Sequence, residues 1–233
     1  MKPMKVRLRE ELQKIQSMKG RIRWEYIWGY YKFHIIGTII GIFIFGSLLN
    51  DLVINPPPRS ILTVAWLADF EWDERLHALG DALDAAVVEN PNREKVFIPT
   101  FYLTDGADPQ NDVAQIQRFQ ALLAARELDI IIGRIEDNDE FEFTGLGMAP
   151  SWVMTDLRPV LAEAGLTVDE DVLRFYYDDE TGLPFAFAMS LEGSVLFADA
   201  GIPTAGRYLG VTVNTENYAH VVAAIRALWI GHE

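Results

Sequence analysis

An almost uninterrupted apolar run from Phe33 to Leu49 constrains this chain more than any other feature of its sequence. The only polar side chains in the run are those of His34, Thr38 and Ser47. A helix on the surface of a globular protein shows a polar face with a period of 3.6 residues, whereas here isoleucine and phenylalanine cover every face. The pattern disfavours a core helix and favours a segment that crosses a bilayer, which needs about 17–25 residues.

The sequence on either side of the run favours a permanent anchor over a cleaved export signal. A secretory signal has a short basic segment, a short apolar core and an A-x-A-like cleavage site. Here a long basic segment precedes the run, and the exit passes through Asn50, Asp51 and Ile54 to three consecutive prolines without an A-x-A sequence. We therefore predict an uncleaved transmembrane helix over residues 33–54.

Aromatic side chains are concentrated directly before the apolar run. Tryptophan and tyrosine are enriched where membrane helices leave the hydrocarbon core. We predict a membrane interface formed by Trp24, Tyr26, Trp28, Tyr30, Tyr31 and Lys32. The alternative, an aromatic cluster packed inside a soluble helix, is disfavoured by the adjoining apolar run. The lipid bilayer is thus a predicted partner of the chain.

The net charge changes sign at the apolar run. Residues 1–33 contain nine Lys/Arg and three Glu, a net charge of +6, whereas residues 34–233 contain eleven Lys/Arg and thirty-one Asp/Glu, a net charge of −20. Because basic residues mark the cytoplasmic end of a membrane helix, we predict a single-pass protein of the cell membrane with a cytoplasmic N-terminus and an extracytoplasmic C-terminal domain. The acidic domain would repel nucleic acid, so we exclude nucleic-acid binding.

These features predict four parts: a cytoplasmic basic segment (1–32), a transmembrane helix (33–54), a proline-rich linker (55–59) and an extracytoplasmic domain (60–233). Consecutive prolines favour an extended conformation, so the linker would act as a stiff spacer. Within the first part, residues 5–22 have the apolar spacing of an amphipathic helix with a basic polar face. That helix could lie on an anionic inner leaflet or only enforce the topology.

The residues after the linker alternate between strand and helix patterns. Apolar runs predict strands at 60–68, 95–103 and 128–133, separated by helices at 72–90 and 108–127. This alternation is typical of right-handed crossovers between parallel strands. The later sequence predicts a hairpin within 173–190, a strand at 208–215 and helices at 156–165, 191–201 and 216–231. The predicted fold class is α/β, a three-layer domain with a mainly parallel sheet.

Three segments resemble, in their order, pieces of the extracellular solute-binding proteins of bacterial ABC importers: "LLAARELDIIIG", "TGLPFAFAMSLEGSVLFADAGIP" and "YLGVTVNTENYAHVVAAIRALW". The aromatic-basic stretch and anchor resemble uncharacterised single-pass membrane proteins of Gram-positive bacteria. The resemblance covers 60–233 in patches and implies one lobe of a periplasmic-binding-protein fold. That family closes two lobes over its ligand. Here only Ala200–Tyr208 separates the second segment from the third, so most of the second lobe is missing.

The candidate ligand-binding residues follow from the predicted sheet. In an open parallel sheet, ligands bind beyond the carboxyl ends of the strands. That rule and, for the last residue, the resemblance select Asp69, Phe70, Trp72, Thr104, Asp105, Gly133, Arg134 and Ser190. Arg134 is the sharpest candidate, because a guanidinium can hold a carboxylate or phosphate through two hydrogen bonds. The alternative for Arg134 is a surface salt bridge with Glu136 or Asp137.

No sequence pattern indicates catalysis, a metal or a cofactor. The chain has no cysteine, which excludes a disulfide framework, a thiol nucleophile and a cysteine-ligated zinc. The acidic run at 136–142 lacks the alternation of a calcium loop, and "TGLGMAP" lacks the third glycine of a dinucleotide-binding turn. We predict a non-enzymatic protein without metal or cofactor. Two functions stay open: binding or sensing of a small-molecule ligand, and a structural or interaction subunit with a membrane or envelope protein partner.

Overall fold

The computed structural model describes residues 13, 17, 18, 20–54, 56–68, 74–102, 108–135, 153–177 and 182–230 of the chain. The chain divides into two compact units, Met1–Pro57 and Pro58–Glu233. The predicted amphipathic segment at 5–22 falls mostly outside the described residues.

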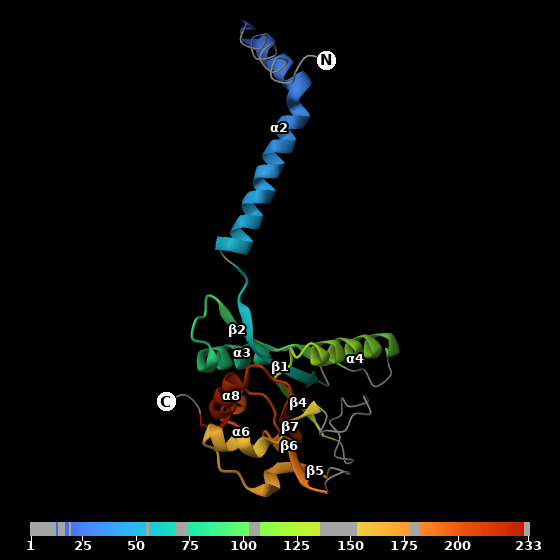
Figure 1. Cartoon of the computed structure of the whole chain (residues 1–233), viewed down its shortest axis with the longest axis vertical. Helices are drawn as coiled ribbons and strands as arrows, with labels where there is room; N and C mark the ends of the chain where they lie inside the picture. The colour runs from blue at the N-terminus through green and yellow to red at the C-terminus, as the bar shows by residue number, and fades with distance from the viewer. Residues whose placement is uncertain are drawn as a thin grey trace. The chain divides into compact units, whose positions relative to one another are not determined.

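The first unit contains one long apolar helix. Helix α2 (Arg21–Leu49) continues into a π-helical turn, η1 (Asn50–Ile54), and none of the described residues of α2 or η1 is buried. At 1.5 Å per residue, the 34 residues from Arg21 to Ile54 extend for about 50 Å, more than the roughly 30 Å of a bilayer core. The prediction of a helix long and apolar enough to cross a membrane is confirmed, and this helix begins at Arg21, before the predicted start at Phe33. Figure 1 shows α2 as a single long helix.

The second unit is built on a seven-stranded mixed sheet with the order β2-β1-β4-β7-β6-β5, in which β3 also pairs with β1. β1 pairs in parallel with β2, β3 and β4, whereas the β4–β7, β7–β6 and β6–β5 pairs are antiparallel. The predicted parallel arrangement therefore holds for one half of the sheet, and every neighbouring pair in the other half is antiparallel. The strands are β1 (Arg59–Ala68), β2 (Glu94–Phe97), β3 (Thr100–Tyr102), β4 (Ile130–Arg134), β5 (Leu173–Tyr177), β6 (Pro184–Ser190) and β7 (Arg207–Val211).

The predicted strand at 95–103 is two strands, because a proline interrupts it. Pro99 has no N–H to donate to a neighbouring strand, and its carbonyl instead accepts a hydrogen bond of 2.9 Å from the Trp66 N–H. β2 consequently pairs with the first half of β1, and β3 pairs with the second half. This break carries the chain along β1 toward the carboxyl end of the sheet.

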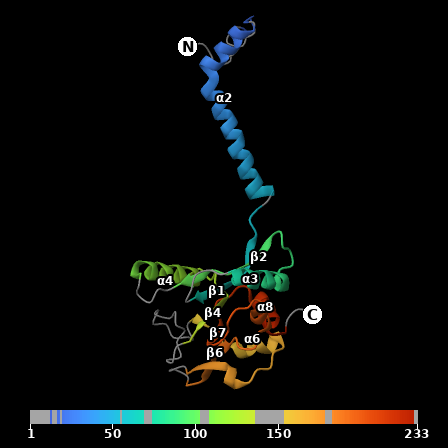
Figure 2. The same ribbon diagram turned by 180° about the vertical axis from the view of Figure 1, so that it is seen from behind.

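Helices cover both faces of the sheet. Helices α3, α6, α7 and α8 contact one another on one face, and α4 packs against β3 on the other. Figures 1 and 2 show α3, α6 and α8 grouped together, with α4 apart from them. Helix α3 connects β1 to β2, and α4 connects β3 to β4, and these two connections cross the sheet in opposite directions. Because both connections are right-handed, their helices lie on opposite faces of the sheet. The helices are α3 (Glu74–Val87), α4 (Pro109–Ala124), α6 (Leu157–Ala164), α7 (Val195–Asp199) and α8 (Tyr218–Ile230), with a 3₁₀ turn, η2 (Glu170–Val172).

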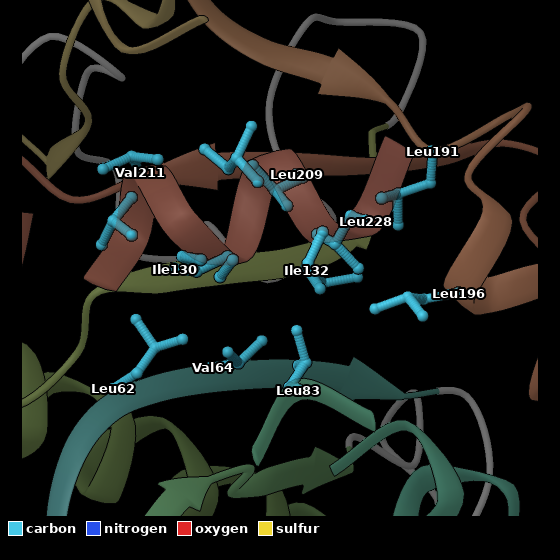
Figure 3. Packing of buried hydrophobic residues seen from close by; sticks show 14 of the residues in the cluster. Leu62, Val64, Leu83, Ile130, Ile132, Leu191, Leu196, Leu209, Val211 and Leu228 are labelled. Atoms are coloured by element: carbon cyan, nitrogen blue, oxygen red, sulfur yellow. The ribbon is translucent and has the colours of Figure 1, made fainter. Parts of the chain in front are cut away.

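The main core lies between the central strands and the helices on the α8 face. Because side chains alternate along a strand, one face of the sheet presents Leu62, Val64, Ile130, Ile132, Leu209 and Val211 (Figure 3). Leu228 of α8 lies among these side chains. The intervening positions Leu67 and Ile131 belong to a second cluster, together with Phe101 of β3 and Phe119 of α4. The central strands are therefore buried on both faces.

A buried carboxylate connects three parts of this sheet. Asp129, directly before β4, is fully buried. Its oxygens accept hydrogen bonds from the Thr63 N–H of β1 at 2.8 Å, from the Thr215 hydroxyl at 2.6 Å and from the Asn217 amide at 3.1 and 3.2 Å. Thr215 and Asn217 precede α8, so Asp129 holds the start of that helix against β1 and β4. A buried carboxylate is tolerated only where hydrogen bonds satisfy it in this way.

Replacing this carboxylate should destabilise the second unit. In Asp129→Asn, one of the two carboxylate oxygens becomes an NH2 group that faces N–H and O–H donors, and the single remaining oxygen cannot accept from all of them. We expect the free energy of unfolding to fall by about 1–3 kcal/mol or more, measured by urea denaturation of residues 58–233. The control is Asp169→Asn, because Asp169 is exposed and makes no capping hydrogen bond. Equal effects of the two substitutions would contradict the anchoring role of Asp129.

Candidate functional site

The carboxyl ends of β1, β3 and β4 lie at the same edge of the sheet, because β3 and β4 both run parallel to β1. This edge is where the ligand-binding rule for open α/β sheets places a site. Five of the predicted site residues lie outside the described residues and stay predictions: Asp69, Phe70, Trp72, Thr104 and Asp105. The described candidates are Gly133, Arg134 and Ser190.

Gly133 has a packing role in β4. A Cβ atom at this position would lie 2.8 Å from Cδ1 of Leu67 and 3.1 Å from its Cβ. Contacts this short cannot be accommodated without displacement of the side chain or the strand. The absence of a side chain at Gly133 therefore lets β1 and β4 pack with Leu67 directly over the backbone of β4.

Arg134 faces a second arginine across the sheet. In the antiparallel register of β4 and β7, Arg134 is directly opposite Arg207, just as Gly133 is opposite Tyr208. Directly opposed residues have Cα atoms about 4.5–5.5 Å apart, and their side chains leave the same face of the sheet. Arg134 is exposed, whereas Arg207 is only 3% exposed. Two arginines are thus neighbours in the register, one exposed to solvent and one buried.

The guanidinium of Arg207 is held against the end of β1. Its central carbon lies 4.8 Å from the ring centroid of Trp66, and Nη1 donates a hydrogen bond of 3.3 Å to the Leu67 carbonyl. The Trp66 ring stacks in turn on Phe197 of α7, with 5.9 Å between centroids. Cation–π contact with a desolvated tryptophan is favourable. The aromatic pair therefore holds a buried positive charge at the carboxyl edge.

Ser190 lies on the opposite face of the sheet from Arg134. It is paired with Tyr208 in the β6–β7 register, and Tyr208 belongs to the α4 face. The Ser190 hydroxyl accepts a hydrogen bond of 3.2 Å from the Glu192 N–H, and Arg174 donates one of 2.6 Å to the Tyr208 hydroxyl. Arg134, which the strand-end rule selected, and Ser190, which the resemblance added, therefore lie on different faces of the sheet.

The sequence rule did not select Arg207. An arginine in front of an apolar strand resembles an ordinary exposed residue, and the strand itself was predicted to begin only at Tyr208. Its burial on Trp66 and its position opposite Arg134 depend on the register between β4 and β7, which no local pattern encodes. No local sequence signal selects Arg207.

Within the described part of the chain, no group of three or more His, Asp or Glu residues is arranged to hold a metal ion. The described histidines are on different elements: His34 on α2, His77 on α3 and His220 on α8. The acidic run at 136–142 and the "TGLGMAP" segment lie outside the described residues. The predictions of no metal and no cofactor stay predictions.

The predicted interface residues all lie in the N-terminal part of α2. Trp24, Trp28 and Tyr31 share one side of the helix by their three- and four-residue spacing. Tyr26 and Tyr30 share another, with their rings 4.8 Å apart. The aromatic residues therefore surround the helix as a band, a distribution that suits an interface between lipid and water. Lys32 follows, with its Nζ 5.1 Å from the Phe33 ring centroid.

An ion pair at the start of α6 perturbs a carboxyl group. Burial of Asp156 raises its pKa, but hydrogen bonds and charge attraction from Arg158 outweigh this effect, and the pKa is lowered from the ordinary value of 3.8. Asp156 is the N-cap of α6 and accepts a hydrogen bond of 3.1 Å from the Arg158 N–H. Arg158 also donates to the Pro184 carbonyl at 2.9 Å. The pair therefore connects the start of α6 to β6.

Comparison of the chain with protein-family models, with curated proteins and with solved structures finds no match.

Adding a methyl group at Gly133 should destabilise the sheet. We expect Gly133→Ala to lower the free energy of unfolding by about 1–3 kcal/mol, the usual cost of overpacking a core. The control is Gly80→Ala in α3, where the new Cβ would lie 3.6 Å from Ile98, an ordinary contact. Because glycine is a poor residue inside a helix, that variant should gain up to about 1 kcal/mol. Urea denaturation of both variants tests the opposite signs.

Removing the α6 cap should cost stability in a pH-dependent way. Asp156→Ala should lower the free energy of unfolding by about 0.5–2 kcal/mol at pH 7, the usual loss for an N-cap. Because the folded pKa is lowered, the stabilisation is present above pH 3.8 and is lost as the pH falls through the folded pKa. Denaturation at pH 7 and at pH 3 should therefore show a smaller difference from wild type at pH 3. A difference that grows at low pH would contradict this assignment.

Proposed function

We propose that this chain is a single-pass membrane protein that displays an extracytoplasmic α/β domain, and that this domain binds or senses a small solute at the carboxyl edge of its sheet without catalysing a reaction. The observation that carries the proposal is the pair of arginines at that edge, where Arg134 of β4 lies directly opposite the buried Arg207 of β7.

The membrane part of the proposal is supported by α2 and η1. Their 34 residues form a candidate span in which no residue of the most apolar window is buried. Apolar side chains exposed on every face of a helix are unfavourable in water and favourable in hydrocarbon. The net charge of +6 on residues 1–33 favours a cytoplasmic N-terminus. The proposed location of the second unit is then the extracytoplasmic side.

The solute-binding part is supported by the topology of the second unit. After β1 the chain forms β2 on one side of β1 in the sheet, and it later forms β4 on the other side of β1. Neighbouring parallel strands whose connections diverge in this way leave a crevice at their carboxyl ends, where α/β proteins bind ligands. The resemblance to one lobe of a solute-binding protein agrees with this placement.

A second function is favoured by the presence of one compact unit after the linker. Pro58–Glu233 forms a single unit, and one lobe cannot enclose a ligand by closing on another. The unit could therefore act as an interaction subunit of a membrane or envelope complex, without solute affinity. This alternative predicts a stable protein partner and no response to solutes.

The topology can be tested directly, because the chain contains no cysteine. Gln13→Cys and Asp171→Cys each introduce one thiol at an exposed position, one in each unit. In intact cells, a membrane-impermeant maleimide should label Asp171→Cys only. Both variants should react after permeabilisation, and the wild-type chain should never react. Labelling of Gln13→Cys in intact cells, or release of the protein by alkaline carbonate, would contradict the proposed anchor and orientation.

Solute binding can be tested with a thermal-shift screen of residues 58–233 against amino acids, sugars, peptides, carboxylates and phosphates. A ligand at 100 times its dissociation constant should add about 2.7 kcal/mol of stability. A rise of several degrees with one class of compound would support the proposal. A cooperative melt without any shift would contradict it for these classes and favour the interaction subunit, to be followed by cross-linking in intact membranes.

A further inference from the structure

We infer that a cavity between α3 and β2 binds a small zwitterion with an apolar body, the chemistry of an aliphatic amino acid. The cavity has a volume of about 190 Å³, and Figures 1 and 2 show its two walls, α3 and β2, side by side. Because β2 pairs with the first half of β1, the cavity lies along the outer edge of the sheet and not at the carboxyl ends of β1 and β4. It is therefore a second site, in addition to the one proposed above.

The walls of the cavity combine an apolar surface with two opposite charges. Leu76, Val96 and Ile98 line it and are buried. Asp81 of α3 and Lys95 of β2 also line it and are exposed, one on each wall. An apolar pocket with a few polar groups is the usual form of a small-molecule site. The volume is below the roughly 300–1,000 Å³ of pockets for drug-sized ligands, so the ligand must be smaller than these.

The two charges favour a ligand that carries both an ammonium and a carboxylate group. Among the described residues, neither the Asp81 carboxylate nor the Lys95 ammonium takes part in a hydrogen bond or an ion pair. Each can therefore form a charge-assisted hydrogen bond with the opposite charge of a bound solute. Residues 34–233 carry a net charge of −20. This charge repels a simple anion but not a zwitterion, whose own charges cancel.

Gly80 provides independent support for a cavity that is kept open. It lies inside α3, where glycine lowers stability relative to alanine. No close contact requires a glycine, because a Cβ atom at this position would lie 3.6 Å from Cδ1 of Ile98, an ordinary contact. Ile98 and Gly80 both line the cavity, so an added methyl group would enter the space that a ligand would occupy. The glycine therefore lowers helix stability and preserves the cavity.

A second carboxylate of α3 argues against an extended peptide as the occupant. β2 is an outer strand of the sheet, and strands at such edges are templates for pairing with another chain. Here the Val96 N–H donates a hydrogen bond of 2.5 Å to the Asp84 carboxylate, so a donor that an incoming strand would use is already occupied. The same hydrogen bond holds α3 against β2 and fixes the walls of the cavity. A small solute therefore suits this edge better than a peptide strand.

The test uses the full chain in micelles of dodecyl maltoside, whose headgroup carries no charge. Leucine, valine and alanine are titrated by calorimetry. Two analogues of leucine each lack one charge, because isocaproate has no ammonium group and isoamylamine has no carboxylate group. The cavity variants are Gly80→Ala, Asp81→Asn and Lys95→Gln. The matched controls remove the same charges from exposed residues that do not line the cavity, and they are Glu89→Gln and Arg93→Gln.

We expect at least one of the three amino acids to bind the wild-type chain. Isocaproate and isoamylamine should bind at least tenfold more weakly than the tightest of them. Gly80→Ala should raise the melting temperature of the ligand-free chain and yet weaken binding at least tenfold, a combination that a purely structural role would not produce. Asp81→Asn and Lys95→Gln should also weaken binding at least tenfold, and both control variants should bind as the wild type does.

Three results would overturn the inference. Binding of none of the amino acids would refute the zwitterion, and the function proposed above would be retained if another class of solute raised the melting temperature. Amino-acid binding that is weakened by Arg134→Gln but not by the three cavity variants would place the solute at the carboxyl edge of the sheet. Equal binding of isocaproate or isoamylamine would show that one of the two charges is not recognised.

Discussion

The buried carboxylate of Asp129 is the interaction on which the second unit most depends. It lies directly before the central strand β4, and its hydrogen bonds reach β1 on one side and the start of α8 on the other. A carboxylate removed from water is costly unless donors surround it, so these residues must be brought together for the fold to form. The contact joins the parallel half of the sheet to the helix that covers its core.

The two ends of β4 have different chemistry. At the amino end, the Asp129 carboxylate accepts hydrogen bonds from donors of its own chain. At the carboxyl end, Arg134 is exposed and lies opposite a second arginine. Four buried residues, Ile130–Gly133, separate the two ends. The structural anchor and the proposed binding site are therefore at opposite edges of the sheet, so the anchor can be rigid without restricting access to the site.

The two units of the chain differ in the environment that suits each. Helix α2 exposes apolar side chains on all faces, whereas the second unit buries its apolar residues in two clusters on the two faces of a sheet. Transfer to hydrocarbon would stabilise such a helix, whereas the second unit is stabilised by removal of its own side chains from water. This difference in physical chemistry is the basis for proposing a membrane anchor that carries a water-soluble domain.

The sequence by itself determined the elements whose signals are local. The apolar run predicted α2, and periodic spacing predicted α3, α4 and α8. The Asp108–Pro109 start of α4 and the Gly165 end of α6 were also visible in the sequence. All of these signals are local, because caps and periodicity involve residues within one or two turns. The break at Pro99 was missed, although the proline was visible. Only the tertiary structure decided that Arg134 lies opposite Arg207, that Ser190 lies on the other face, and that Asp129 is buried among donors. Each depends on strand register or on contacts between distant segments, and a shift of one residue in register would move every side chain to the opposite face.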